Sequence, residues 1–364
     1  MMLRQLHTAL GARFSNLNGV EVIADYGQVE LEARRIAESA AILDLSARGR
    51  LCLTGADRVR FLHGQVTNDI KRLRVGEGCY AALVTAKGKM QSDLNVYCLA
   101  DELLLDFEPG LSGKVVKRLE QYLVADDVQV IDVASHYGLL SVQGPRSRSV
   151  LEQMELFKEL PGQACNFTKT ADPTLGEIYV VLNYRTVNEG FDIFVPVAAR
   201  EEVLGKLQAA ASSVNGGLCG WTALETARIE AGIARYGQDM DENCFPQECG
   251  IEQRAVSYSK GCYIGQEVLN RLHTMGHVNR QLRGLKLDPH LQTLPGKGDK
   301  LMYQGKEAGM VTSAARSPLL SANIALGFVR REWNAAGTVL TLRAGEVETE
   351  AEVADLPFAR AITG

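Results

Sequence analysis

One octapeptide, residues 260–267, carries the strongest chemical signal in the chain and reads Lys-Gly-Cys-Tyr-Ile-Gly-Gln-Glu. Residues 267–273 contain no helix breaker, so we expect a helix to begin shortly after Cys262. The first turn of a helix offers free backbone N–H groups and the positive end of the helix dipole. Together with the ammonium of Lys260, this setting favours a thiolate over a thiol. The segment therefore predicts a reactive cysteine, and the alternative is a partly buried structural cysteine.

A second candidate is the carboxylate of Asp93, which lies in a segment of alternating side chains. Residues 90–99 are typical of a strand on which Gln91, Asp93 and Asn95 share the polar face. A half-exposed strand has such a face in any case. If the face instead lines a cavity, Asp93 is placed to hydrogen-bond a heterocycle or to accept a proton from an amine.

Three further candidates flank a helix that we expect to begin at a capping box, residues 222–225, and to run to about Ile229. They are Trp221, Arg228 and Glu230. Their chemistry alone favours ordinary roles, with the tryptophan as a core anchor and the two charged groups on the surface.

A metal site has little support from the sequence. The candidate ligands are Cys244, Cys249, Cys262, His273 and His277. Their spacing matches no usual zinc pattern, so we expect unrelated thiols, surface histidines and no metal centre. Neither a dinucleotide-binding fingerprint nor a Walker A sequence occurs, so nucleotide binding has no positive support.

The composition of the 364 residues is ordinary for a soluble globular protein, with 46% apolar and 23% charged residues. A net charge of −5 argues against a general binder of nucleic-acid backbones. No apolar run approaches the roughly 20 residues of a membrane helix, and residues 1–16 lack the apolar core of a secretory signal. The eight cysteines are scattered without CxxC motifs, which indicates reduced thiols in the cytoplasm.

Helical and strand patterns mix without strict alternation, which favours an α+β fold over a doubly wound sheet. A helix is expected over residues 57–76, with Asp57 as its N-cap and Gly76 as its stop. Further helices are expected over residues 111–123, from Pro145 and over residues 203–211. Besides the strand at 90–99, strands are expected at residues 50–54, 79–85, 103–107, 128–133, 138–143, 177–182 and 191–195.

After about residue 280 short apolar stretches alternate with turn residues, which predicts a small all-β domain. Its strands are expected at residues 282–287, 300–303, 308–312, 324–329 and 339–342. The chain is therefore expected to divide into residues 1–280, with an internal break near residues 135–147, and residues 281–364.

Several segments resemble, in the right order, the glycine-cleavage T-protein (aminomethyltransferase) superfamily. They are residues 49–57, 61–62, 66–69, 88–94, 228–232, 236–237, 246–248 and the carboxy-terminal β segment. This resemblance covers nearly the whole chain. It implies a T-protein-like folate-binding fold, with two α+β subdomains followed by a small β-barrel.

The octapeptide is similar to the signature of the YgfZ family within this superfamily. That resemblance implies tetrahydrofolate or a one-carbon derivative as cofactor, together with a transiently bound iron–sulfur cluster. It also implies iron–sulfur assembly proteins or client enzymes as partners, among them enzymes that modify tRNA. No direct contact with nucleic acid or membrane is implied, and the expected location is the cytoplasm, or the mitochondrial matrix in a eukaryote.

The resemblance assigns roles to individual residues of this chain. Lys260 and Cys262 match the octapeptide signature, with Cys262 as an essential thiol. Glu230 matches a pterin contact of T-proteins, and Trp221 lies near a tryptophan implicated in folate binding. Asp93 matches the second member of an acidic pair in T-proteins.

The remaining assignments follow the chemistry of folate. Arg228 belongs to the matched Arg-x-Glu-Ala-Gly block. The cation expected to attract the anionic glutamate tail is Lys260, Lys87 or Arg271. The carboxylate of Glu230 suits the guanidine-like edge of a pterin. An aromatic ring can stack on the flat face of the pterin. The chain departs from T-proteins at Ser92, where they have the first acidic residue, and at Glu108, where they have an asparagine.

Three functional hypotheses follow. The leading one is a tetrahydrofolate-binding factor that supports iron–sulfur cluster assembly or repair, with Cys262, Lys260 and Asp93 as its chemical groups. The alternative is a folate-dependent aminomethyltransferase of the T-protein type, which rests on the whole-chain resemblance and on Asp93. The third is a non-catalytic folate-binding scaffold. If the chain is an enzyme, the resemblance implies a folate-dependent one-carbon transferase.

Overall fold

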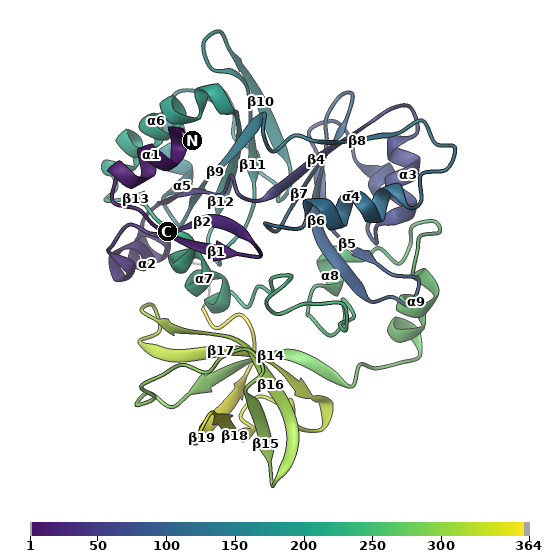
Figure 1. The fold of residues 1–364 in the computed structure, drawn as a ribbon, viewed down its shortest axis with the longest axis vertical. Helices are drawn as coiled ribbons and strands as arrows, with labels where there is room; N and C mark the ends of the chain where they lie inside the picture. Colours follow the sequence, from purple (N-terminus) through teal and green to yellow (C-terminus); the bar gives the residue numbers. More distant parts are fainter. Residues whose placement is uncertain (1, 360–364) are drawn as a thin grey trace.

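The computed structural model describes residues 2–359 and contains two α+β subdomains and a β-barrel (Figure 1). The first sheet runs in the spatial order β5 (Gly78–Val84), β6 (Met90–Cys98), β7 (Leu103–Phe107), β4 (Gly49–Thr54), β8 (Gln129–Asp132). The second runs β10 (Phe167–Asp172), β11 (Gly176–Leu182), β12 (Gly190–Pro196), β9 (Tyr137–Gln143), β3 (Ala41–Asp44), β13 (Gly217–Leu218). The barrel closes through β14 (Arg280–Leu287), β17 (Ala322–Arg330), β16 (Lys306–Ser317), β15 (Lys300–Tyr303), β18 (Val339–Ala344), β19 (Val347–Ala354). The expected α+β fold with a terminal barrel is confirmed.

Alternating apolar residues bury one face of the first sheet against helices α3 (Arg58–Gln65) and α4 (Ser112–Glu120). Leu94 and Val96 of β6 join Leu119 of α4 in that core. Because side chains alternate along a strand, positions 93 and 95 point to the opposite face. The polar face of β6 is therefore turned away from the core.

The helix expected over residues 57–76 is shorter than predicted and ends at Gln65. Val66 already has an extended backbone and forms an isolated bridge with Leu83 of β5. Tertiary pairing with the sheet thus outweighs the helical spacing of the apolar residues that follow.

The second sheet is covered by helices α5 (Ser147–Gln153) and α6 (Arg200–Ser212). Helix α2 (Val29–Glu38) packs on α7 (Trp221–Glu230), close to the amino-terminal helix α1 (Met2–Ala9) and the hairpin of β1 (Arg13–Leu17) and β2 (Val20–Asp25). The described residues contain no helix with the length and apolarity that a membrane span requires.

Helix α7 does not use the expected capping box, because it begins at Trp221 with Gly220 as its N-cap. The N–H of Gly220 donates to the buried carboxylate of Glu32 at 2.9 Å. The carboxylate of Glu225 is consequently not needed at the helix start, and it pairs with arginines instead.

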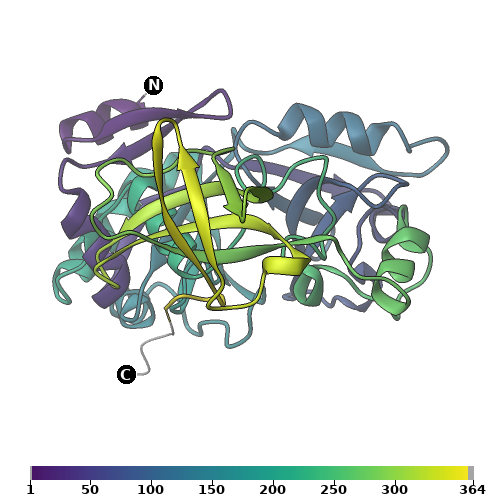
Figure 2. The ribbon, with the colours of Figure 1, turned by 90° about the horizontal axis from the view of Figure 1, so that it is seen from below.

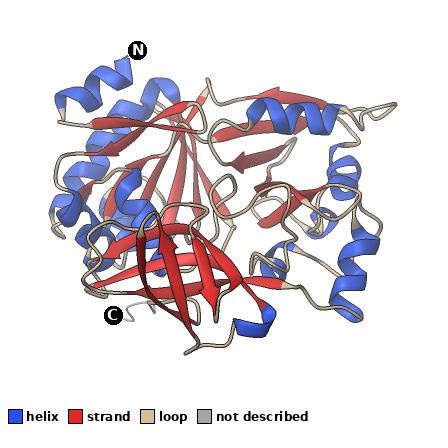
Figure 3. Cartoon of the chain, turned by 60° about the horizontal axis from the view of Figure 1, so that its bottom comes forward, coloured by secondary structure: helices blue, strands red, loops and turns tan. Residues whose placement is uncertain are grey.

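The barrel packs beneath α7 (Figure 1), and it lies in front of the two subdomains when the molecule is turned (Figures 2 and 3). Strand β16 contacts helix α7. Asp239 joins the two units, because it accepts a hydrogen bond from Thr312 of β16 at 2.5 Å and pairs with Arg228 of α7 at 2.6 Å. The sixth strand, β19, was not among the five barrel strands expected from the sequence.

Candidate functional site

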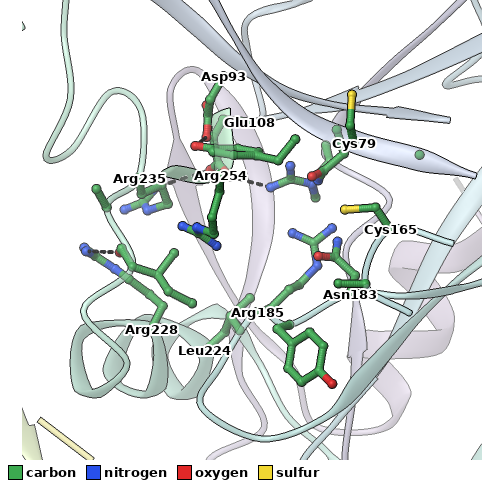
Figure 4. A pocket seen from close by; sticks show the side chains of 18 of the residues that line it. Cys79, Asp93, Glu108, Cys165, Asn183, Arg185, Leu224, Arg228, Arg235 and Arg254 are labelled. Carbon is green, nitrogen blue, oxygen red and sulfur yellow. Dashed lines mark hydrogen bonds and ion pairs between the residues drawn. The ribbon is translucent and has the colours of Figure 1, made fainter. Parts of the chain in front are cut away.

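A cavity of about 460 Å³ opens between the two amino-terminal subdomains. Its wall is formed by β5, β6, the end of β7, the loops at residues 164–165 and 183–185, and the polar side of α7. In Figure 4, Asp93 and Glu108 lie together at one end, and Arg254 and Arg185 project between that end and Cys165. The cavity is therefore a mixed site, with apolar walls and several charged groups.

The carboxyl group of Asp93 has few partners for a buried acid. One oxygen accepts a hydrogen bond from the hydroxyl of Tyr80 at 2.9 Å, and the other is buried without a hydrogen-bond partner. Burial, together with the charge of Glu108, raises the pKa of Asp93 to about 6. The group is thus poised to exchange a proton near neutral pH.

Behind this carboxyl group lies an arginine network that fixes the other acids. Arg48 forms a two-point pair with Asp106 at 2.8 and 3.0 Å and also binds Glu108. Arg185 binds Asp192 at 2.6 Å and reaches Asp106 at 3.3 Å. Burial alone would raise the pKa of Asp106, but the neighbouring guanidinium groups hold it below the usual value. The network ties the two subdomains together, and three of its side chains line the cavity: Arg48, Glu108 and Arg185.

Helix α7 and the residues after it supply the opposite wall. Trp221 is 8% exposed, and its indole N–H is buried without a hydrogen-bond partner. Glu225 pairs with both Arg228 and Arg235, the latter at 3.2 Å. A buried indole donor normally finds an acceptor, so this unpaired N–H favours a polar ligand here.

Arg254 stands apart from the other cavity arginines. Its guanidinium lies 5.3 Å from the ring centroid of Tyr80, and it forms no ion pair with a carboxylate among residues 2–359. A cation without a protein counter-ion at a cavity wall is available to an anionic part of a ligand.

The structure brings three of the sequence-predicted residues together at the cavity: Asp93, Trp221 and Arg228. It places Glu230 elsewhere, at the junction with the barrel, where Ser317 donates a hydrogen bond to its carboxylate at 2.5 Å. Glu230 does not line the cavity. The carboxylate of Glu230 is therefore engaged by a barrel residue, and its expected contact with a pterin stays a prediction.

The octapeptide also lies outside the cavity wall. Lys260 is 6% exposed, and its ammonium donates to the carbonyls of His63, Val66 and Asn68 at 2.5, 2.7 and 2.8 Å. Burial lowers the pKa of Lys260 to about 8. Cys262 is exposed. The lysine expected to activate the thiol or attract the folate tail instead binds backbone carbonyls.

We expect the Lys260→Met variant to lose roughly 2–3 kcal/mol of unfolding free energy, since three buried carbonyls would lose a charged donor. Urea unfolding followed by circular dichroism measures this. Cys262→Ser is the matched control, and its exposed position predicts a change within about 0.5 kcal/mol. Equal stability of the Lys260→Met variant and the unaltered protein would contradict a stabilising role for the contacts of Lys260 with these carbonyls.

The sequence-based reasoning missed most of the charged cavity wall. The missed residues are Arg48, Arg185, Glu225, Arg235 and Arg254, and Glu108 was noted only as a departure from T-proteins. The sequence held one signal for Glu108, since Asp106 and Glu108 alternate along their segment as Asp93 and Asn95 do along theirs.

Among the described residues no group of three His, Cys, Asp or Glu side chains is placed to hold a metal ion. Of the candidate ligands, His273 instead pairs with Glu252 at 2.9 Å.

Two family models match the chain, the GCVT N-terminal domain over residues 3–260 and the glycine cleavage T-protein C-terminal barrel domain over residues 280–359. The chain is 28% identical to an aminomethyltransferase of Halothermothrix orenii, with 98% of each chain covered. It is 27% identical to an aminomethyltransferase of Shouchella clausii, covering 98% of this chain and 96% of the relative. The crystal structure of glycine cleavage system aminomethyltransferase T from Bartonella henselae superposes with a TM-score of 0.87 at 24% identity, over 99% of this chain and 97% of that one. That likeness shows the fold.

Proposed function

We propose, from the premise that the chain belongs to the glycine cleavage T-protein family, that it is a tetrahydrofolate-dependent aminomethyltransferase. The cavity carries the proposal, since Asp93 and Trp221 both line it and each has a buried polar atom, a carboxyl oxygen and the indole N–H, without a hydrogen-bond partner. The full-length similarity to proteins named aminomethyltransferase supports it.

The leading sequence-based hypothesis, an iron–sulfur assembly or repair factor, is wrong. Relatives matched over almost their whole length are named aminomethyltransferase, which favours the alternative hypothesis. The proposal accordingly includes no iron–sulfur cluster and no iron–sulfur partner. The narrower resemblance of the octapeptide to the YgfZ signature stays a prediction, as does the expected cytoplasmic or mitochondrial location.

In the proposed reaction an aminomethyl group carried on a thiol, R–S–CH2–NH3+, reacts with tetrahydrofolate. The products are methylenetetrahydrofolate, the free thiol R–SH and NH4+, so atoms and charge balance. Bound tetrahydrofolate supplies the two nitrogens that accept the carbon. Asp93 holds and moves a proton at that position, because burial and the charge of Glu108 raise the pKa of its carboxyl group to about 6.

The other cavity residues bind and orient the substrate in this proposal. Trp221 offers a ring face to the pterin and an N–H donor to its polar edge. Arg254 is free to pair with the anionic glutamate tail. Arg228 is held by Asp239 and shapes the wall. Lys260 positions the loop at residues 63–68, and Cys262 has no part in the transfer.

The proposal keeps the expected division of the chain. Residues 1–280 form the folate-binding region, with a break near residues 135–147, and residues 281–364 form the barrel domain. In support, the first sheet ends in sequence with β8 at Asp132, and β9 of the second sheet begins at Tyr137. The chain also changes sheet earlier, because β3 belongs to the second sheet and β4 to the first.

Ammonia release from an aminomethylated lipoyl carrier protein, measured with and without tetrahydrofolate, tests the proposal. We expect folate-dependent release that saturates with both substrates. Folate binding without any turnover would instead establish the non-catalytic scaffold. Absence of both binding and turnover would overturn the folate assignment altogether.

A further inference from the structure

Two carboxylates face each other across the strands that form one end of the cavity. Strands β6 and β7 are antiparallel, and Asn95 pairs with Asp106. Asp93 lies two residues before Asn95 on β6, and Glu108 lies two residues after Asp106, directly past the end of β7 at Phe107. Because side chains alternate along a strand, both residues are on the side of the sheet that faces the cavity, and both line it. Like charges that lie close together at the edge of neighbouring strands repel. Figure 4 shows the two side chains adjacent.

The surroundings of the two carboxylates are unequal. Glu108 is 7% exposed, one of its oxygens binds Arg48, and the other lies 3.8 Å from Arg235. Asp93 has no arginine partner and accepts only the hydroxyl of Tyr80. A fixed cation favours the ionised form of an acid, and burial without one favours the protonated form. The cavity end therefore pairs one acid that has arginine neighbours with one that has none.

The other charged groups at this end of the cavity do not remove the difference between Asp93 and Glu108. Asp106, the next acid on β7, is neutralised by Arg48 and Arg185. On β5 the facing group is the phenol of Tyr80, over which Arg254 lies. Beyond it, α7 contributes Glu225, which is paired with Arg235. Glu108 is thus the carboxylate that acts on Asp93 at close range.

We propose that Glu108 is a positioning residue, the fixed anion of a two-carboxylate pair that keeps the exchangeable proton on Asp93. Pairs of acids whose environments separate their protonation divide acid and base roles in this way. When Asp93 donates, its O–H bond breaks and an N–H bond forms on a basic nitrogen of the substrate. Two adjacent carboxylates remain, and their repulsion favours return of a proton to Asp93.

The pair also specifies what the cavity accepts at this end. After Asp93 has lost its proton, the two carboxylates are both negative and a cation stabilises them. The geometry therefore favours a ligand with a protonated amine or an iminium group over a ligand with a neutral amine. The identity of that amine rests on the proposed function. The proton sharing between Asp93 and Glu108 does not, because it is a property of the free protein.

Carbon-13 NMR titration of the aspartate carboxyl groups tests the pair without substrates, with Asp93→Asn used to assign the signal. In Glu108→Gln we expect the titration midpoint of Asp93 to fall by roughly one pH unit, since a neutral amide replaces the opposing charge. Glu108→Asp keeps the charge and should keep the raised midpoint. Glu225→Gln, which removes a cavity carboxylate that is not opposite Asp93, should leave it unchanged.

An unchanged midpoint in a folded Glu108→Gln variant would overturn the proposal, whatever the protein catalyses. If Glu108→Gln does not fold, a Glu108→Asp midpoint at the ordinary aspartate value would overturn it equally. The pH profile of aminomethyl transfer supplies the second readout. Glu108→Gln should move the alkaline limb of kcat to lower pH, and a shift confined to KM would contradict the positioning role.

Discussion

The Asp93→Asn variant is expected to lose aminomethyl transfer by roughly 10²- to 10⁴-fold in kcat, the usual contribution of a positioned acid or base. The amide keeps the shape of the side chain and the contact with Tyr80, but it cannot exchange a proton. The measurement is steady-state ammonia release, with tetrahydrofolate affinity determined separately by calorimetry. A variant with near-normal kcat would remove Asp93 from the chemistry.

The same substitution is expected to stabilise the fold above about pH 6. The pKa of Asp93 in the folded protein is raised to about 6 from the ordinary 3.8, so the folded state binds more protons within that interval. Stability is therefore greatest at low pH and decreases as pH rises through the interval. The amide of the Asp93→Asn variant cannot ionise, so the Tm of that variant should exceed that of the unaltered protein by roughly 2–4 °C at pH 8 and match it near pH 4. Lower stability of the variant at pH 8 would show that activity was lost through unfolding.

The Arg48→Met variant is expected to lose roughly 3–5 kcal/mol of unfolding free energy, the usual cost of breaking a buried ion pair from one side. Asp106 is 0% exposed and Glu108 is 7% exposed, so both acids would lose their main counter-ion in a buried setting. Denaturant unfolding measures the loss.

A surface arginine is the matched control for Arg48. The side chain of Arg60 is 63% exposed and also bridges two acids, Asp57 and Asp126. Exposed pairs contribute little, so Arg60→Met should cost about 1 kcal/mol or less. Similar losses in the two variants would contradict a structural role for the buried network.

Local patterning predicted much of the framework that positions the site. Side-chain alternation alone placed Asp93 and Asn95 together on the polar face of β6, and the strands at residues 103–107 and 300–303 have the expected bounds. These strands can be predicted from the sequence because strand periodicity and core burial are properties of short segments.

The octapeptide shows where local chemistry is insufficient. Lys260 stands two residues before Cys262, but its ammonium binds carbonyls 192 to 197 residues away in the chain. No property of the segment itself reveals those partners. The partner of Glu230 is distant in the sequence for the same reason, because Ser317 belongs to the barrel. The arginines of the cavity wall likewise come from separate elements that only the tertiary fold brings together.

The most direct test of the proposed aminomethyl transfer follows the transferred carbon itself. A lipoyl carrier protein loaded with a ¹³C-labelled aminomethyl group is mixed with the protein and tetrahydrofolate, and the label is observed by NMR. We expect the label to move into methylenetetrahydrofolate, at a rate that Asp93→Asn reduces sharply. A label that stays on the carrier while tetrahydrofolate is bound would contradict it.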